Sequence, residues 1–316
     1  MTTPGPQSDA EIPAYLDALG LPGLVDLHVH FLPPTMQTKV WAYFDEAPRH
    51  YGRAWPIHYR LPEAERIDIL RGFRLAVIPA LSYPHKPGMA EWLNEWSAQF
   101  ARRVPGALHC ATLYPEPGVG RYVRAAIAGG ARLFKVHVQV GGFSPDDVLL
   151  DQAWEPLADN GIPVVMHAGS GPLRGSHTGP DPVARLLDRH PRLTLVIAHL
   201  GMPEYDAFAD LALAHPGVHL DTTMAATDFT QDIAPLPVSY PARLSQLRAK
   251  IVLGTDFPNI PYPYAHQLRA LAGLDLGDDW TRDVLWHNGR RLLGLTTRDD
   301  ATAADGSRTP GTPWTN

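Results

Sequence analysis

The chain has 316 residues, 45% of them hydrophobic and 19% charged, which is the balance of an ordinary globular protein. Its formal net charge of −6 excludes a basic face for a phosphate backbone, so we expect a small-molecule substrate and no nucleic-acid partner. No uncharged apolar run reaches the roughly 18 residues of a membrane helix, and the first residues lack the pattern of a secretory signal. We therefore expect a cytoplasmic protein with no membrane partner. Cys110 is the only cysteine, which excludes an intrachain disulfide and a cysteine-rich zinc site.

The two ends of the chain contain few apolar residues. Residues 1–10 are polar and rich in proline, and residues 296–316 offer too little apolar surface to offset the entropy lost on ordering. We therefore expect both segments to be disordered and residues 11–295 to form a single folded domain.

Short apolar segments recur along this domain in the pattern of β-strands separated by helices. Their starts lie 24 to 50 residues apart, which leaves room for a crossover helix after each strand. The predicted strands are residues 24–30, 74–81, 107–113, 132–138, 162–167, 193–198, 217–222 and 250–255. Eight such units predict an α/β fold of the (β/α)8 TIM-barrel type. The alternative, an open doubly wound sheet, usually carries a glycine-rich turn after its first strand, whereas the first strand here ends in HVHFLPP.

A long insertion of about residues 31–66 follows the first predicted strand and is rich in aromatic residues, among them Trp41, Tyr51 and Trp55. In a barrel this segment lies on the rim formed by the C-terminal ends of the strands, where the βα loops build active sites. Two interpretations remain open. The insertion forms a lid or substrate wall that includes Trp55, or it is a surface excursion packed on its own aromatic side chains.

Histidines alternate with apolar residues in the first predicted strand. Successive side chains of a strand point to opposite faces, so Asp26, His28 and His30 share one face, which we expect to point into the barrel. Two imidazoles spaced in this way can converge on one metal ion. The pair alone is weak evidence, because histidines also serve as hydrogen-bonded core residues.

Polar residues also follow three later strands. His167 ends the fifth predicted strand, His199 follows the sixth, and Asp256 follows the eighth. Buried polar groups at strand ends cost several kcal/mol unless they are paired or coordinated. A shared ion satisfies all of them, and a set of imidazoles with one carboxylate suits zinc, with manganese or iron(II) as alternatives.

The string DLHVHFLPP, the two later strand-end histidines and the string GTDFP resemble the amidohydrolase superfamily. The resemblance is strongest to its amidohydrolase-related branch, which includes aminocarboxymuconate semialdehyde decarboxylase, and it covers about residues 22–295. It implies a metal-dependent enzyme whose ligands are His28, His30, His167 and Asp256. His199 then either binds a second metal ion or acts on the substrate.

Lys135 shares the inward face of the fourth predicted strand with His137. An unpaired ammonium group inside a barrel is unfavourable. In two-metal relatives a lysine at this point is carboxylated and bridges the ions, so Lys135 and His199 join the ligands of a binuclear centre, which favours a hydrolase. The alternative is a plain amine that contacts a substrate carboxylate or a neighbouring acid. One ion or two therefore stays open.

We expect a hydrolase that cleaves a C–N or C–O bond of an amide, ester or lactone. A metal ion lowers the pKa of a water molecule towards about 7, Asp256 takes its proton, and His199 stabilises the developing negative charge. A metal-dependent decarboxylase of an unsaturated or aromatic acid is the alternative enzyme, and a barrel that only binds a ligand is a third interpretation. The candidates for binding the substrate are Lys135, His137, Tyr83, Arg174 and Trp55. The oligomeric state is not readable from the sequence, and a homodimer stays open.

Overall fold

The structure is a computed structural model that describes residues 2–295. Parallel strands alternate with helices throughout this range, as the sequence predicts. The strands are β1 (Ile78–Pro79), β2 (Ala107–Leu108), β3 (Cys110–Thr112), β4 (Leu133–His137), β5 (Val164–His167), β6 (Leu195–Ile197), β7 (Val218–Asp221) and β8 (Ile251–Val252). Each lies inside one of the predicted strands from the second to the eighth, with β2 and β3 forming two parts of the third.

The strands pair in parallel around a ring. β1 pairs with β2, and β3 to β8 form one continuous sheet in sequence order. The first predicted strand closes the ring, because Leu24 bridges Leu75 on one side and Asp26 bridges Leu253 on the other. This segment forms isolated bridges rather than a ladder, since His28 N donates to the Asp26 side chain instead of to a neighbouring strand. The predicted parallel α/β arrangement is confirmed.

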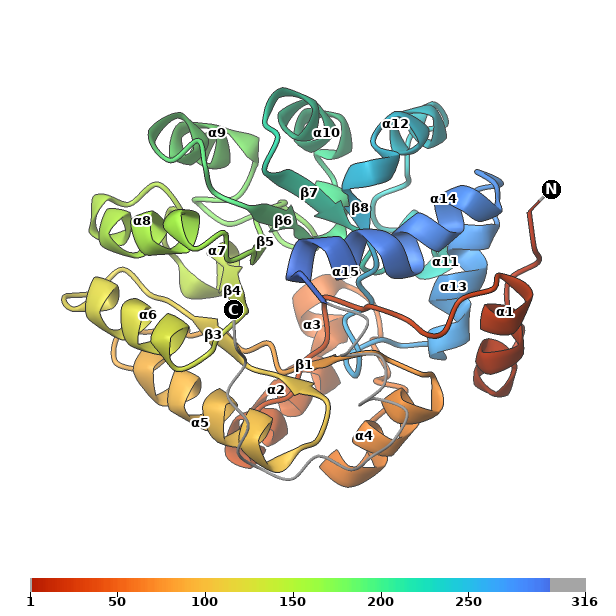
Figure 1. Cartoon of the computed structure of the whole chain (residues 1–316), viewed down its shortest axis with the longest axis horizontal. Helices are drawn as coiled ribbons and strands as arrows, with labels where there is room; N and C mark the ends of the chain where they lie inside the picture. Colours follow the sequence, from red (N-terminus) through yellow and green to blue (C-terminus); the bar gives the residue numbers. More distant parts are fainter. Residues whose placement is uncertain (1, 296–316) are drawn as a thin grey trace.

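The main helices lie around the outside of the strands (Figure 1). Helix α9, for example, buries Val183, Leu186 and Leu187, the i, i+3, i+4 spacing of a helix with one apolar face. Within residues 2–295, no helix has both the length and the apolar content needed to cross a bilayer. The helices are α1 (Ile12–Ala18), α2 (Pro34–Asp45), α3 (Ala47–Tyr51), α4 (Glu63–Gly72), α5 (Ala90–Arg103), α6 (Val119–Ala128), α7 (Val138–Gly141), α8 (Asp151–Asp159), α9 (Pro180–Arg189), α10 (Tyr205–Ala214), α11 (Asp228–Gln231), α12 (Tyr240–Gln246), α13 (Tyr264–Ala272), α14 (Asp278–Arg282) and α15 (Asn288–Leu293).

Different segments cover the two ends of the ring. At the N-terminal ends of the strands, Val25 N donates to Leu285 O, and α15 runs across the ring in Figure 1. At the C-terminal ends, Trp55 of the aromatic insertion donates through Nε1 to Asn259 O in the loop after β8. The insertion, which includes α2 and α3, therefore lies at the rim where the βα loops meet.

The first ten residues, which we expected to be disordered, lie along α13 and α14 from residue 2 onward. Thr3 N donates to Asp278 Oδ1 over 2.6 Å, and Ala265 N donates to Asp9 Oδ1 over 2.9 Å. Polar contacts of this kind order a segment that offers little apolar surface, which composition alone does not reveal. The predicted disorder of residues 296–316 lies outside the described residues.

A glycine after β8 makes room for the side chains that end β7. A Cβ atom on Gly254 would come within 2.3 Å of Thr223 Oγ1 and 2.9 Å of Asp221 Cγ. Asp221 and Thr223 are both fully buried. The close approach explains the glycine of the GTD motif, because any larger residue would displace these two side chains.

Gly254→Ala should lower the free energy of unfolding by about 1–3 kcal/mol, the usual effect of overpacking a tight interior. Gly72→Ala is the matched control, since Gly72 ends α4 and an added Cβ there has no neighbour within 4 Å. The control should leave stability unchanged or raise it by about 0.4–1 kcal/mol. Urea denaturation measures both changes, and equal stabilities would contradict the close approach at Gly254.

Candidate metal centre

Three of the predicted metal ligands converge at the C-terminal end of the barrel. His30 Nε2 lies 2.9 Å from Asp256 Oδ1, and His28 Nε2 lies 3.8 Å from the same oxygen. Backbone hydrogen bonds set this arrangement, because Asp256 N donates to His28 O and His30 N donates to Phe257 O. Closure of the ring thus places the H-x-H and GTD motifs side by side.

Both histidines present the same ring nitrogen to Asp256. His28 Nδ1 lies 2.9 Å from Asp221 Oδ2, and His30 Nδ1 lies 3.0 Å from Leu81 O. Carboxylate and carbonyl oxygens only accept hydrogen bonds, so each Nδ1 carries the proton. His28 Nε2, which lies 2.8 Å from the Lys135 amine, then keeps its lone pair, the form in which a histidine oriented through its other nitrogen binds a metal ion. His30 Nε2 instead lies in hydrogen-bond contact with Asp256 Oδ1.

The chemistry of this group fits a divalent ion. One donor atom from each of His28, His30 and Asp256 lies within 4.8 Å of the other two. Two imidazoles and one carboxylate form a donor set that zinc, manganese and iron(II) accept. The imidazoles are almost fully buried, whereas the Asp256 side chain is 16% exposed. The group is therefore open to a ligand on the side of Asp256.

His167 and His199, the other strand-end histidines, lie beside this group. His167 Nε2 is 2.9 Å from Gly171 O, and the His167 ring stacks on His137 with centroids 4.0 Å apart. The centroid of the His199 ring lies 4.7 Å from that of His167 and 5.4 Å from that of His28. Within the described residues, neither histidine belongs to the set of three converging ligand atoms.

His199 combines an unsatisfied ring nitrogen with a strained backbone. Its Nδ1 is buried and has no hydrogen-bond partner within residues 2–295. Its φ of 57° lies in the left-handed region, which costs a non-glycine residue on the order of 1–3 kcal/mol. A free polar atom held by a strained backbone favours a role towards a ligand over a role in packing.

Lys135 points into the barrel, as predicted, and contacts one of the predicted metal ligands. Its Nζ lies 2.8 Å from His28 Nε2. Burial lowers the pKa of Lys135 from 10.5 to about 8. The amine is therefore a direct neighbour of the nitrogen that we predict as a ligand.

The protonation states of the centre are those that metal binding requires. Burial raises the pKa of Asp256, but the hydrogen bond with His30 and the nearby His28 outweigh this effect and hold the pKa well below 3.8. Burial, with Lys135 nearby, lowers the pKa of His28 to about 4. Burial and the nearby His28 lower the pKa of His199 to about 4 as well. At neutral pH the ionised carboxylate of Asp256 thus lies near the neutral imidazoles of His28 and His199.

Two buried carboxylates that contact His28, one at its ring and one at its backbone, were not among the predicted site residues. Asp221 ends β7 and contacts His28 Nδ1. Asp26 accepts from His28 N over 2.9 Å and from the Tyr264 hydroxyl over 2.8 Å, and burial raises its pKa to about 7. The criterion applied to His167, a polar residue at a strand end, identifies Asp221 too when it is extended to the seventh strand.

Aromatic side chains flank the centre near Asp256. The Tyr83 ring lies 5.8 Å from the His30 ring and 4.8 Å from the His137 ring. Burial raises the pKa of Tyr51, and the nearby Tyr83 and Asp256 add to this shift. Tyr51 belongs to α3 of the aromatic insertion, and Trp55 of the same insertion donates to Asn259 O in the loop that carries Asp256, so the insertion reaches the neighbourhood of the centre.

The insertion also packs on its own aromatic residues. The Trp55 side chain is buried, and the centroid of its ring lies 5.7 Å from that of Tyr51. Trp55 therefore packs behind Tyr51 and supports this part of the insertion. Both interpretations of the insertion therefore hold in part. Arg174, the remaining predicted substrate-binding residue, is exposed and forms no ion pair within the described residues.

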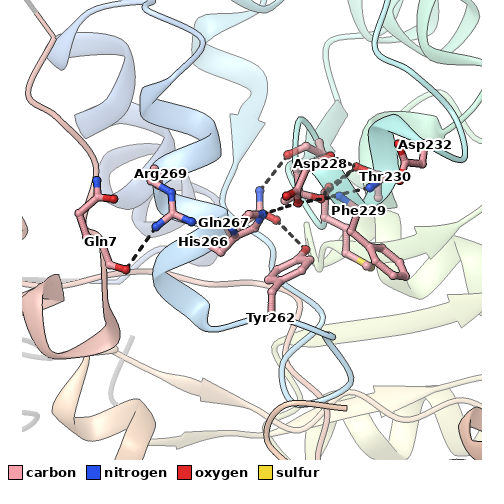
Figure 2. Close-up of polar contacts among 12 residues, drawn as sticks. Gln7, Asp228, Phe229, Thr230, Asp232, Tyr262, His266, Gln267 and Arg269 are labelled. Atoms are coloured by element: carbon pink, nitrogen blue, oxygen red, sulfur yellow. Dashed lines mark hydrogen bonds and ion pairs between the residues drawn. The ribbon is translucent and has the colours of Figure 1, made fainter. Parts of the chain in front are cut away.

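The loop after β7 carries α11, which polar contacts tie to neighbouring segments (Figure 2). His266 Nε2 on α13 lies 2.8 Å from Asp228 Oδ1, and Arg269 donates to His266 Nδ1 over 2.7 Å. From the insertion, Arg53 donates to Phe229 O over 2.9 Å and lies over the Phe229 ring. Helix α11 is thus held between α13 and the aromatic insertion.

The metal-free protein should lose stability as the pH falls from about 6.5 to about 4. An unfolded histidine has a pKa near 6.5, whereas the pKa of His28 and of His199 in the folded centre is about 4. Within this window the unfolded chain binds protons that the folded centre excludes, so the free energy of unfolding falls by about 1.4 kcal/mol per pH unit for each such histidine.

Urea denaturation in the presence of a chelator, at pH 7.5 and pH 5, measures this loss. Replacement of His199 by Asn should make the pH dependence shallower by about one proton. His85→Ala should leave it unchanged, because His85 is exposed in the folded protein. Stability that is constant across the window would contradict the neutral histidine centre.

Solved structures share this fold. An uncharacterised TIM-barrel protein from Bordetella bronchiseptica is 19% identical with a TM-score of 0.66, over 89% of this chain and 99% of that chain. A 5-carboxyvanillate decarboxylase from Novosphingobium aromaticivorans, solved with manganese and 4-hydroxy-3-methoxy-5-nitrobenzoic acid, is 14% identical with a TM-score of 0.56, over 86% and 96%. A protein from Pseudomonas putida described as a 2-pyrone-4,6-dicarboxylic acid hydrolase is 14% identical with a TM-score of 0.56, over 86% and 97%.

A search among curated proteins finds no match. The model of the amidohydrolase family, in contrast, matches residues 25–295 of the chain. This range contains the H-x-H pair, both later strand-end histidines and the GTD motif, and the match confirms the resemblance that these residues carry. The chain therefore belongs to the amidohydrolase family.

Proposed function

We propose that this protein is a metal-dependent hydrolase that cleaves a C–N or C–O bond of a small molecule such as an amide, an ester or a lactone. The observation that carries the proposal is the convergence of His28 Nε2 and His30 Nε2 on the Asp256 carboxylate. Membership of the amidohydrolase family supports it. The partial exposure of Asp256 gives a substrate one side from which to approach.

The proposed ligands are His28, His30 and Asp256, with His167 as the fourth. A bound divalent ion supplies an activated water and polarises a substrate carbonyl. Zinc is the proposed ion, and manganese or iron(II) are the alternatives, with manganese present in the structurally similar decarboxylase. Lys135 and His199 join the ligands if the centre holds two ions.

Asp256 is the proposed proton acceptor. Its low pKa keeps the carboxylate ionised at neutral pH, and its exposed edge faces the side from which the substrate approaches. His30 Nε2 holds one carboxylate oxygen at 2.9 Å, which limits rotation of the side chain. Asp256 takes a proton from water and returns it to the leaving group.

His199 is the proposed partner of the substrate oxygen on which negative charge develops. Its buried Nδ1 has no partner within residues 2–295, so a substrate oxygen can accept a hydrogen bond from it. Donors that are already oriented in a buried site stabilise such charge without reorganisation. Tyr83 and His137, whose rings are in contact, are proposed to contact the rest of the substrate.

A metal-dependent decarboxylase of an unsaturated or aromatic acid is the second candidate. The observation in its favour is the Lys135 amine, which lies 2.8 Å from His28 Nε2 and can pair with a substrate carboxylate. Decarboxylation releases carbon dioxide, whereas hydrolysis incorporates an oxygen atom from water. A panel of amides, esters, lactones and aromatic acids, assayed for both products, distinguishes the two reactions.

The purified protein should bind about one equivalent of zinc or manganese per chain after supplementation at mild pH. His28→Ala and His30→Ala should each reduce the bound metal to a small fraction, because each removes one of the three converging ligand atoms. Elemental analysis after dialysis measures the metal. His85→Ala is the control for a histidine that is exposed and should retain the wild-type content. Less than about one-tenth of an equivalent on the wild-type protein would contradict the centre.

Asp256→Asn should abolish turnover, with a loss of about 10³-fold or more, because it removes a ligand and the proton acceptor together. The fold should persist, which circular dichroism and the unfolding transition report. Asp228→Asn is the control for a carboxylate on α11 that is largely exposed and should keep most of the activity. A wild-type rate in the Asp256 variant would overturn the assigned role.

A further inference from the structure

A buried carboxylate lies directly opposite the proposed metal ligand His28. Asp221 ends β7, has no exposed surface, and places Oδ2 at 2.9 Å from His28 Nδ1. This nitrogen is the one that faces away from Asp256, since His28 Nε2 is the ring atom that lies 3.8 Å from Asp256 Oδ1. The hydroxyl of Thr223 lies 2.9 Å from the same Nδ1 and can adapt as donor or acceptor. The carboxylate, in contrast, can only accept.

The other oxygen of the same carboxylate holds the backbone around the centre. Asp221 Oδ1 accepts from His199 N and from Thr223 N, each over 2.9 Å. His199 has the strained backbone and the free ring nitrogen described above, so this hydrogen bond anchors the turn that presents its ring. The space that Asp221 occupies exists because Gly254 has no side chain.

We propose that Asp221 is the positioning residue of this centre, which fixes His28 in the Nδ1-protonated form and so keeps His28 Nε2 available to a metal ion. The inference rests on the proposed function, because it assigns Asp221 a role towards the proposed ion. One carboxylate thereby links two separate parts of the centre, the ligand His28 and the backbone of His199.

Asp221→Asn tests the proposal with almost no change of shape. The asparagine oxygen stays with the two backbone donors, His199 N and Thr223 N, so the amide nitrogen faces His28 Nδ1. An amide nitrogen donates, and a donor at this position favours the Nδ1 lone pair and moves the ring proton to Nε2. Loss of a partner that orients a ligand typically lowers metal affinity by about 10–100-fold.

The measurement is the Zn²⁺ dissociation constant of the full chain, obtained by competition with a chelating dye. We expect Asp221→Asn to weaken Zn²⁺ binding by about 10–100-fold while the protein stays folded. Asp26→Asn is the matched control, because Asp26 is equally buried and accepts from His28 N, but does not contact its ring nitrogens. The control should change the affinity by less than about threefold, a shift of under 1 kcal/mol.

An unchanged affinity in Asp221→Asn, or an equal loss in both variants, overturns the proposal. A second readout depends neither on metal nor on the stability of a variant. It is the ¹⁵N NMR spectrum of the metal-free wild-type protein labelled at histidine. The His28 signals are identified because they are absent from the spectrum of His28→Gln. We expect a protonated Nδ1 and an unprotonated Nε2 for His28, and the reverse arrangement overturns the inference. A wild-type chain that binds no Zn²⁺ contradicts the proposed function instead, and the ¹⁵N spectrum then decides on Asp221 alone.

Discussion

The parallel pairing of the first predicted strand with the loop after β8 is the constraint on which the whole centre depends. Asp26 bridges Leu253 and Val29 bridges Phe257, so this segment runs beside the residues that carry the GTD motif. Side chains alternate along a strand, and a shift of one residue would turn the two histidines towards the helices. The centre is therefore a consequence of ring closure, which buries His28 and His30 and leaves the Asp256 side chain partly exposed.

Ionisable groups are tolerated inside this barrel because nearly every one has a partner. Asp221 accepts three hydrogen bonds, from His28, His199 and Thr223, and these offset the cost of removing a carboxylate from water. Lys135 is likewise placed beside His28. Within the described part of the centre the exception is His199 Nδ1, which has no partner. Because the other polar groups of the centre have hydrogen-bond partners, the unpaired His199 Nδ1 is the atom best suited to bind a ligand.

Local patterns were sufficient to predict much of this protein. Strands β1 to β8 and the bridging segment of residues 24–30 lie where short apolar runs predict them. Polar residues at the ends of these runs likewise predict His28, His30 and Asp256, because both signals can be recognised within one strand. Asp221 carries the same strand-end signal, but the strand alone does not show that its partner is His28, which lies 193 positions away. Residues 2–10 and helix α11 are likewise fixed in place by contacts with segments that are distant in the sequence. Composition and periodicity carry no information about such contacts.

Backbone strain is concentrated at the same end of the barrel as the polar centre. Of the seven non-glycine residues with positive φ in the described chain, five lie in the segments after β6, β7 and β8, and His199 and Asp256 are among them. Such conformations cost on the order of 1–3 kcal/mol each and persist only where surrounding contacts hold them. At His199 the holding contact is the Asp221 carboxylate, and at Asp256 it is the hydrogen bond from Asp256 N to His28 O. Hydrogen bonds from the first strand and from the end of β7 thus hold His199 and Asp256, to which we assign the chemistry, in their strained conformations.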